Sequence, residues 1–238
     1  MSRKKIIIPL DVDTAKKAVA LVELLKNDVA AFKVGLELIN AAGPAIFDNV
    51  RQAGADKIFY DCKLHDIPNT VAGASRAIAK MGVWLFNVHC SGGFAMMKAA
   101  KDASVEAANE IGFDAPKLIG VTVLTSIDQA VLNDEMHVSG SVSDQVVNLA
   151  KLAQDAGLDG VVASPHEIEL IRRACGDDFM IVTPGVRPAG GDIGDQKRVM
   201  TPGEAVRRGA DYLVIGRPIT KADDPAAAAR TIADEMRS

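Results

Sequence analysis

Short runs of consecutive apolar residues alternate along the chain with longer stretches in which apolar residues recur every three or four positions. Unbroken apolar runs are typical of strands buried on both faces, and the longer stretches have the period of amphipathic helices. The expected strands are residues 6–10, 29–34, 57–60, 84–88, 118–124, 160–163, 180–182 and 212–215. The expected helices are residues 15–25, 36–52 with a break at Gly43 and Pro44, 68–81, 94–111, 143–156, 165–175, 202–208 and 225–236.

This strict alternation favours a parallel sheet, because each pair of neighbouring parallel strands needs a crossover connection. The chain has 238 residues, close to the roughly 250 typical of a (β/α)8 barrel. We therefore expect an α/β protein in which residues 1–238 form a single (β/α)8 TIM barrel. The sequence offers no linker, repeat array or low-complexity segment that would suggest a second domain.

Composition narrows the class of protein further. With 48% hydrophobic and 24% charged residues, the chain resembles a soluble globular domain with a large core. A net charge of −4 without a basic run argues against a nucleic-acid or membrane partner. Three cysteines without close pairing fit a reducing compartment. The N-terminal apolar run is too short for a signal peptide and no stretch is long enough to span a membrane, so a cytoplasmic location is expected.

Charged residues concentrate in residues 59–71, FYDCKLHDIPNTV, at the end of an apolar run. Side chains two apart on a strand point the same way, so Asp61 and Lys63 should share a face about 6.5 Å apart. Asp66 follows in a loop, and Pro68 fits the first turn of a helix that Asp66 and its neighbours would cap. A solvated ion pair and a helix cap would explain each residue singly. Together, the alternating acid–base–acid set suits proton transfer or carbanion chemistry.

Polar residues stand at the ends of nearly all the expected strands, where active sites of this fold lie. Polarity also normally begins where strands end, which weakens the inference. The residues in question are Asp11, Lys33, Asp61, Lys63, His89, Thr125, Ser126, Ser164, Arg187 and Arg217.

The loops after the seventh and eighth strands are the usual phosphate site of such barrels. They contain Gly185-Val186-Arg187 and Gly216-Arg217-Pro218, whose backbone N–H groups and guanidinium forks suit phosphate oxygens. The structural alternative is that the glycines only make turns and the arginines face water. The glycine-rich residues 184–198 could act as a lid, with Gln196 reaching the phosphate in the closed state.

A metal site is the less favoured interpretation of the same region. Asp11, Asp61, Asp66 and His89 offer ligands for Mg²⁺. Two lysines in the same pocket already supply positive charge, so we expect neither a metal nor a cofactor. His89 could serve as a general base, but a structural role is favoured, and His65 is expected to be an exposed loop residue.

Six motifs, in order along nearly the whole chain, resemble orotidine 5'-phosphate decarboxylase. The central DxKxxDIPNTV is specific, and the others are collectively strong. They are PLD, FKVG, DxKxxDIPNTV, VTVLTS, PGVR with a downstream DQKR, and IGRPI.

The resemblance implies cofactor-free loss of CO₂ from orotidine 5'-phosphate to give uridine 5'-phosphate, the last step of de novo pyrimidine synthesis. Lys63, Asp61, Asp66 and Lys33 would form the catalytic group. Lys63 would stabilise the carbanion at C6 and then protonate it, while Asp61 would crowd the substrate carboxylate and hold Lys63. Lys33 and Asp11 would position the ribose hydroxyls.

The resemblance also assigns the remaining binding residues. Thr125 and Ser126 would face the pyrimidine. Asp66, Ile67 and Thr70 would reach into the neighbouring subunit's site, which implies a homodimer. The phosphate would be held by Arg187, Gln196, Gly216 and Arg217.

Three other functions remain possible from the residues themselves. A related barrel decarboxylase or aldolase of sugar phosphates would use Mg²⁺ on an enediolate, but Lys33 and the DIPNTV continuation argue against it. In a Schiff-base aldolase, Lys33 or Lys63 would attack a carbonyl, although neighbouring carboxylates favour protonated, unreactive lysines. A barrel that merely binds nucleotide phosphates would gain little from two aspartates near an anionic ligand.

Overall fold

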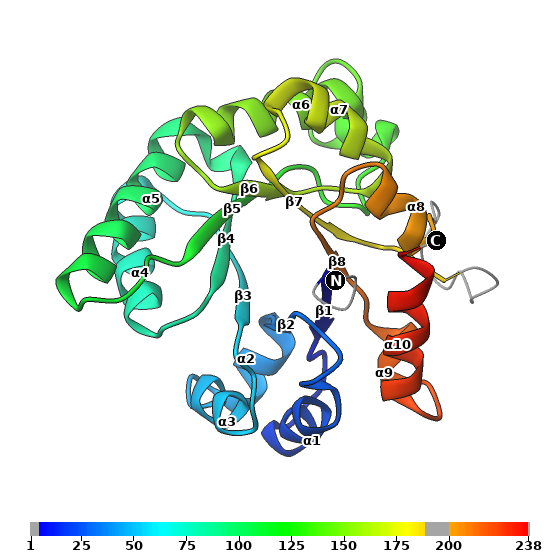
Figure 1. Cartoon of the computed structure of the whole chain (residues 1–238). Helices are drawn as coiled ribbons and strands as arrows, with labels where there is room; N and C mark the ends of the chain where they lie inside the picture. The colour runs from blue at the N-terminus through cyan, green and yellow to red at the C-terminus, as the bar shows by residue number, and fades with distance from the viewer. Residues whose placement is uncertain (1–4, 189–199, 238) are drawn as a thin grey trace.

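Eight parallel strands form a closed barrel in chain order, with β8 pairing back onto β1. The computed structural model describes residues 5–188 and 200–237. Figure 1 shows the helices packed outside the strands. The strands are β1 (Ile6–Pro9), β2 (Ala31–Val34), β3 (Ile58–Leu64), β4 (Leu85–His89), β5 (Lys117–Val121), β6 (Gly160–Val162), β7 (Met180–Pro184) and β8 (Tyr212–Val214). The expected (β/α)8 barrel is confirmed.

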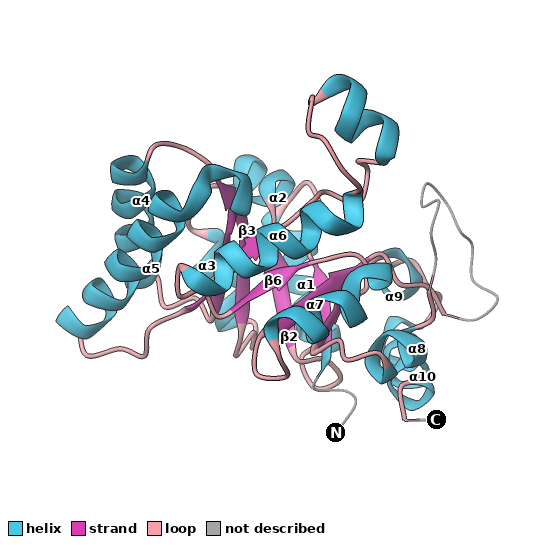
Figure 2. Ribbon diagram, turned by 90° about the horizontal axis from the view of Figure 1, so that it is seen from above, coloured by secondary structure: helices cyan, strands magenta, loops and turns pink. Residues whose placement is uncertain are grey.

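The helices follow the apolar period of the sequence closely. They are α1 (Ala15–Leu25), α2 (Leu36–Ala42), α3 (Ile46–Gln52), α4 (Pro68–Lys80), α5 (Gly93–Glu110), α6 (Val142–Asp155), α7 (Ile168–Cys175), α8 (Pro202–Arg207), α9 (Arg217–Thr220) and α10 (Pro225–Glu235). The break at Gly43 is confirmed, because this residue ends α2 with a φ of 69°, which favours glycine. Figure 2 shows α4 and α5 side by side along one edge of the barrel.

Several boundaries differ from the expectation, and two of them affect the site. β3 runs on to Leu64 instead of ending at residue 60, whereas β5 ends at Val121, before residue 124. α9 and a π-helical turn at Val131–Glu135 were not expected. Each is a short element, and its residues carry no clear period of their own.

The start of α4 is only partly as expected. Pro68 occupies the first helical position, as predicted. The predicted side-chain cap is wrong: Ile67 is the N-cap residue and makes no capping bond. Asp66 Oδ1 instead accepts a hydrogen bond from the N–H of Ile67, at 2.6 Å. The Asp66 carboxylate is therefore held by the chain just before the helix.

The barrel interior and the layer between strands and helices are both apolar. The interior cluster consists of Ile7, Ala31, Phe59, Leu85, Ile119 and Val182. Strand residues of alternate register, such as Ile6 and Ile8, pack outward under the helices. Burial on both faces explains why the strands read as unbroken apolar runs. Full burial of one such large side chain stabilises the fold by about 2–3 kcal/mol.

Aromatic side chains close the N-terminal end of the barrel interior. Trp84 and Tyr212 meet edge to face with ring centroids 5.1 Å apart, and both pack against the interior cluster. Lys57 Nζ lies 5.1 Å from the centroid of the Trp84 ring, within the range of a cation–π contact. This packing leaves the C-terminal end of the strands for polar groups.

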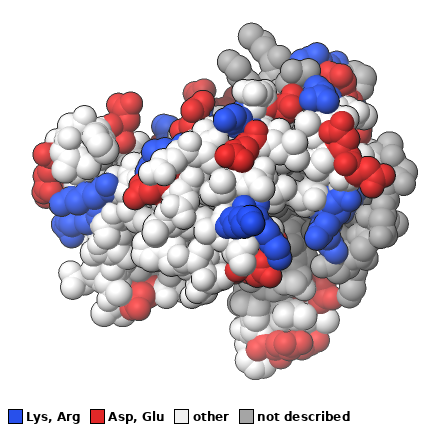
Figure 3. Space-filling view, turned by 90° about the horizontal axis from the view of Figure 1, so that it is seen from below, with Lys and Arg blue, Asp and Glu red and all other residues white. Residues whose placement is uncertain are grey.

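The exposed surface has mixed charge. On the face drawn in Figure 3, basic and acidic side chains lie interspersed among the described residues. No helix within the described part of the chain is both long enough and apolar enough to cross a membrane.

Candidate active site

Four charged side chains form an alternating row at the C-terminal ends of β1, β2 and β3. Lys33 Nζ lies 3.3 Å from Asp11 Oδ1 and 3.2 Å from Asp61 Oδ2. Lys63 Nζ lies 2.5 Å from Asp61 Oδ1. The order is therefore Asp11, Lys33, Asp61, Lys63, with each charge beside one of opposite sign. We call these four residues the charged row.

Strand register explains how residues far apart in the sequence meet here. Lys33 pairs with Pro9 on β1 and with Phe59 on β3. Asp11 and Asp61 each lie two residues beyond these partners, so all three side chains are at the same end of the barrel. Phe59 belongs to the interior cluster, and the period of two places Asp61 above it on the same side.

Lys63 departs from the regular strand that the sequence suggested. Its φ is 49°, in the left-handed region that non-glycine residues rarely adopt. The pairing of β3 with β4 also shifts register between Tyr60 and Leu64. A bulge of this kind redirects a side chain, and here it accompanies the close approach of the Lys63 amine to Asp61.

Asn87 on β4 contacts both members of this pair and was missed in the sequence analysis. Its Nδ2 donates to Asp61 Oδ1 at 2.8 Å, and its Oδ1 accepts from the Lys63 backbone N–H at 2.7 Å. The signal was a lone amide inside the apolar strand LFNVH. Such a residue needs hydrogen-bond partners, because burying an unpaired amide is costly.

The neighbouring cations keep Asp61 ionised. Burial alone would raise the pKa of Asp61, but Lys33, Lys63 and the Asn87 amide outweigh it and hold the pKa below its usual value. The Lys63 side chain is 29% exposed, compared with 11% for Lys33. Lys63 is thus the ammonium of the charged row that is more open to a bound molecule.

Gly35 makes room for the charged row. A Cβ at this position would lie 2.8 Å from Lys33 Nζ and 3.8 Å from Asp11 Oδ1. The backbone φ is −106°, which any residue adopts, so space explains this glycine.

The two histidines lie beside the charged row. The ring centroids of His65 and His89 are 5.4 Å apart. Burial, followed by the charges of His65 and Lys63, lowers the pKa of His89 and so favours the neutral form of this ring. His65 is exposed, as expected. Among the residues that the structure describes, no group of three or more His, Cys, Asp or Glu side chains could hold a metal ion.

The predicted phosphate residues follow β7 and β8, which are neighbours in the barrel. Arg187 is only 7% exposed; its backbone N–H donates to Met200 O and its Nη1 donates to Val186 O. The structural alternative, in which this arginine faces water, is therefore wrong for Arg187. Gly216 is the N-cap of α9, and Arg217 is its first residue. Residues 189–199, which include Gln196 and most of the predicted lid, lie outside the described residues.

The other predicted residues lie on the exposed surface. Thr125 and Ser126 are in an exposed turn beyond β5, four residues or more past its end at Val121. Asp66, Ile67 and Thr70 are exposed around the start of α4, and Ile67 is 67% exposed.

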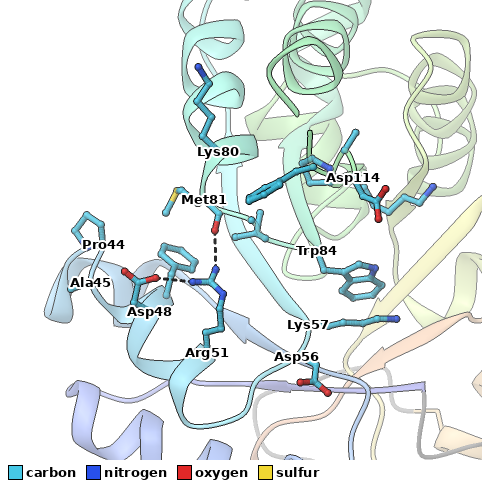
Figure 4. Close-up of a pocket in the computed structure, with 17 residues that line it drawn as sticks. Pro44, Ala45, Asp48, Arg51, Asp56, Lys57, Lys80, Met81, Trp84 and Asp114 are labelled. Atoms are coloured by element: carbon cyan, nitrogen blue, oxygen red, sulfur yellow. Dashed lines mark hydrogen bonds and ion pairs between the residues drawn. The ribbon is translucent and has the colours of Figure 1, made fainter. Parts of the chain in front are cut away.

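A cavity of about 1280 Å³ lies at the opposite end of the barrel, beside the starts of β3, β4 and β5. Figure 4 shows Lys57 and Trp84 on its wall, with the Arg51 guanidinium bonded to Asp48 and to the Met81 carbonyl oxygen. Its location is the N-terminal face, where this fold places stability rather than chemistry. We therefore assign the candidate active site to the charged row.

Comparison with known proteins identifies the family of this chain. Residues 4–232 match the model of the Orotidine 5'-phosphate decarboxylase / HUMPS family. The chain is 55% identical over 235 residues to the orotidine 5'-phosphate decarboxylase of Moorella thermoacetica, covering 99% of this chain and 93% of that relative. It is 48% identical over 236 residues to that of Syntrophomonas wolfei subsp. wolfei, covering 99% and 98%.

Solved structures give the same result. The crystal structure of orotidine 5'-phosphate decarboxylase from Lactobacillus acidophilus aligns with a TM-score of 0.86 and 41% identity, covering 98% of this chain and 99% of that one. That from Pyrococcus horikoshii OT3 aligns with a TM-score of 0.79 and 26% identity, covering 98% and 99%. This chain therefore belongs to the Orotidine 5'-phosphate decarboxylase / HUMPS family.

Proposed function

We propose that this protein, an enzyme of the orotidine 5'-phosphate decarboxylase family, converts orotidine 5'-phosphate to uridine 5'-phosphate and CO₂ without a cofactor. The observation that carries the proposal is the charged row, in which two ammonium groups and two carboxylates alternate within 3.3 Å. Two cations beside a reacting carbon suit a reaction in which negative charge develops on that carbon.

In the proposed step, the bond between C6 and the carboxylate carbon breaks and its electron pair remains on C6. The Lys63 ammonium stabilises this pair and then transfers one proton to C6. The neutral amine regains a proton from water, which its 29% exposure permits. Asp61, held ionised by the surrounding cations, bonds to the Lys63 ammonium and lies against the substrate carboxylate.

The rest of the substrate binds away from the reacting carbon. Lys33 and Asp11 position the ribose hydroxyls, and Thr125 with Ser126 faces the pyrimidine. The phosphate is held by Arg187, Gly216 and Arg217, together with Gln196. Binding energy at the remote phosphate then helps to hold the ring against the charged row.

We also propose a homodimer in which Asp66, Ile67 and Thr70 complete the partner's site. Their exposure around the start of α4, including a 67% exposed isoleucine, supports it. Refolding the inactive variants Lys63→Ala and Asp66→Ala together tests the shared site. Half of the dimers would be hybrids with one intact site, so activity should return to about one quarter of wild type. No recovery from a confirmed hybrid would exclude a shared site.

The reaction itself is tested by the ultraviolet absorbance of orotidine 5'-phosphate in excess EDTA. Wild-type protein should deplete the substrate, whereas Lys63→Ala should lose turnover and keep its affinity for uridine 5'-phosphate. Lys57→Ala is a matched control, because this lysine contacts Trp84 at the other end of the barrel and should leave turnover unchanged.

The same assay separates the alternatives. Inactivity in EDTA, with activity on a keto-sugar phosphate restored by Mg²⁺, would instead indicate a metal-dependent relative. Borohydride trapping of a ketose phosphate on Lys33 or Lys63 would indicate a Schiff-base aldolase.

A further inference from the structure

We infer that Asn87 is a positioning residue of the catalytic site, which orients the Asp61 carboxylate and fixes the backbone of Lys63 from the neighbouring strand. The inference rests on the proposed function, because it concerns how the proton donor of that reaction is held. Asn87 itself is fully buried, with 0% exposure, and does not belong to the charged row.

Both polar atoms of the Asn87 amide are used within the site. Its Nδ2 donates to Asp61 Oδ1, the same oxygen that accepts from Lys63 Nζ. Its Oδ1 accepts from the Lys63 backbone N–H. An amide is the side chain that donates and accepts at once in this geometry, since a carboxylate only accepts and an aliphatic group does neither.

The contact to the Lys63 backbone stabilises an uncommon conformation. A φ of 49° is unfavourable for lysine, and the register of β3 with β4 is irregular here. The N–H of Lys63 therefore takes a side-chain acceptor on β4. Asn87 O in turn accepts from Cys62 Sγ at 3.3 Å, so the segment around Lys63 is joined to Asn87 at more than one point.

The contact to Asp61 adds a neutral donor to a carboxylate that already has charged neighbours. These are Lys33 from β2, with Asp11 beyond it, and Lys63 within β3. His89 from β4 also interacts with Asp61, and burial lowers the pKa of this ring. Asn87 supplies a hydrogen bond of fixed direction, because its side chain is fully buried. It thereby fixes the oxygen to which the Lys63 ammonium binds.

The isosteric variant Asn87→Asp separates positioning from packing. Its new carboxylate still accepts from the Lys63 N–H, but its second oxygen faces Asp61 at the 2.8 Å distance of the lost donor. Two carboxylates this close share one proton at low pH and repel each other when both are ionised. The shared proton replaces the missing amide hydrogen, so lowering the pH should rescue the variant.

The expected result is a pH-dependent defect. For Asn87→Asp, kcat/KM should be about 100-fold below wild type at pH 8 and should recover at least tenfold relative to wild type by pH 5. Asn87→Ala, which has no group to titrate, should be reduced by a ratio that does not change with pH. Ser104→Ala, a buried helical hydroxyl bonded to Lys101 O, is the matched control and should behave as wild type.

Two results would overturn the inference. One is a constant ratio of Asn87→Asp to wild type across this pH range. The other is an Asn87→Ala variant with wild-type kcat, which would decide the question even where Asn87→Asp does not fold. Affinity for uridine 5'-phosphate should change less than fivefold in each folded variant.

A readout without turnover separates this inference from the proposed function. Carbon-13 NMR of the aspartate carboxyls should show that Asn87→Asp takes up a proton above pH 5, whereas Asp61 of the wild type stays ionised there. A wild type that is folded but inactive would refute the proposed decarboxylation alone. Absence of this proton uptake would refute the contact between Asn87 and Asp61.

Discussion

Gly35→Ala should lower activity while leaving the fold almost intact. The new Cβ would lie 2.8 Å from Lys33 Nζ, well inside an ordinary contact distance of 3.4–4 Å. The crowded atom is the end of a flexible side chain, so the lysine moves and the backbone does not. Gly35 has an extended conformation with φ −106° and ψ −173°, which alanine adopts without strain.

The displacement sets the size of the effect. To restore an ordinary contact with the new Cβ, Lys33 Nζ must move by about 0.8 Å. Such a movement away from Asp61 would lengthen the distance from Nζ to Asp61 Oδ2 from 3.2 Å to about 4 Å. At an effective dielectric near 20, this weakens the ion pair by about 1 kcal/mol. If the transition state loses the same amount of stabilisation, kcat/KM should fall roughly five- to tenfold.

The absorbance assay with orotidine 5'-phosphate measures this change, alongside thermal unfolding. Because alanine is a poorer N-cap than glycine, the melting temperature should fall by at most about 4 °C. Gly73→Ala is the control: nothing lies within 4 Å of its Cβ, and it should stabilise α4 by about 1 kcal/mol without changing kcat/KM. A Gly35→Ala enzyme with kcat/KM within twofold of wild type would refute the reasoning.

Three further predictions concern stability and thiol reactivity. Arg172→Ala should lower the free energy of unfolding in urea by about 2–4 kcal/mol at unchanged kcat/KM, because its guanidinium donates to four backbone carbonyls and one carboxylate. A loss below 1 kcal/mol would contradict this. Burial opposes ionisation of Asp159, but a backbone N–H and neighbouring lysines hold its pKa below the usual value. Its stabilisation is present above about pH 4 and is lost as the pH falls through the lowered pKa, so Asp159→Asn should flatten the pH dependence of unfolding below about pH 4. Burial raises the pKa of Cys62 to about 11 and that of Cys90 to about 12, and also raises that of Cys175. Ellman's reagent at pH 8 should therefore detect the three thiols only in denaturant, and rapid reaction of the native protein would contradict this prediction.

The barrel could be predicted because its determinants are local. Most strand residues are buried on one face or the other and are therefore apolar, and each helix carries its own period. The helix at residues 15–25 was predicted with its correct ends, since Thr14 caps it by accepting from the Lys17 N–H. Gly43 marked the break between α2 and α3 for an equally local reason.

The four residues of the charged row lie together at the predicted end of the barrel, but their detailed geometry was not predicted. Asp61 and Lys63 were placed on a regular strand, whereas Lys63 has a left-handed φ and its N–H donates to Asn87 on β4. A contact between residues 24 positions apart leaves no mark on the local pattern around Lys63. The indication of this contact in the sequence is its acceptor, Asn87, a polar residue within an otherwise apolar run.

The two ends of the barrel use charge differently. At the N-terminal end, the Arg172 guanidinium is surrounded by carbonyl oxygens and a carboxylate, so its hydrogen-bonding capacity is largely used within the protein. At the C-terminal end, Lys63 bonds to Asp61 from an uncommon backbone conformation, and its side chain remains 29% exposed. Charges that are already oriented need little reorganisation when a reaction creates new charge beside them. Under the proposed function, the uncommon backbone of Lys63 would hold the proposed proton donor in place, with Asn87 as the group that maintains this conformation.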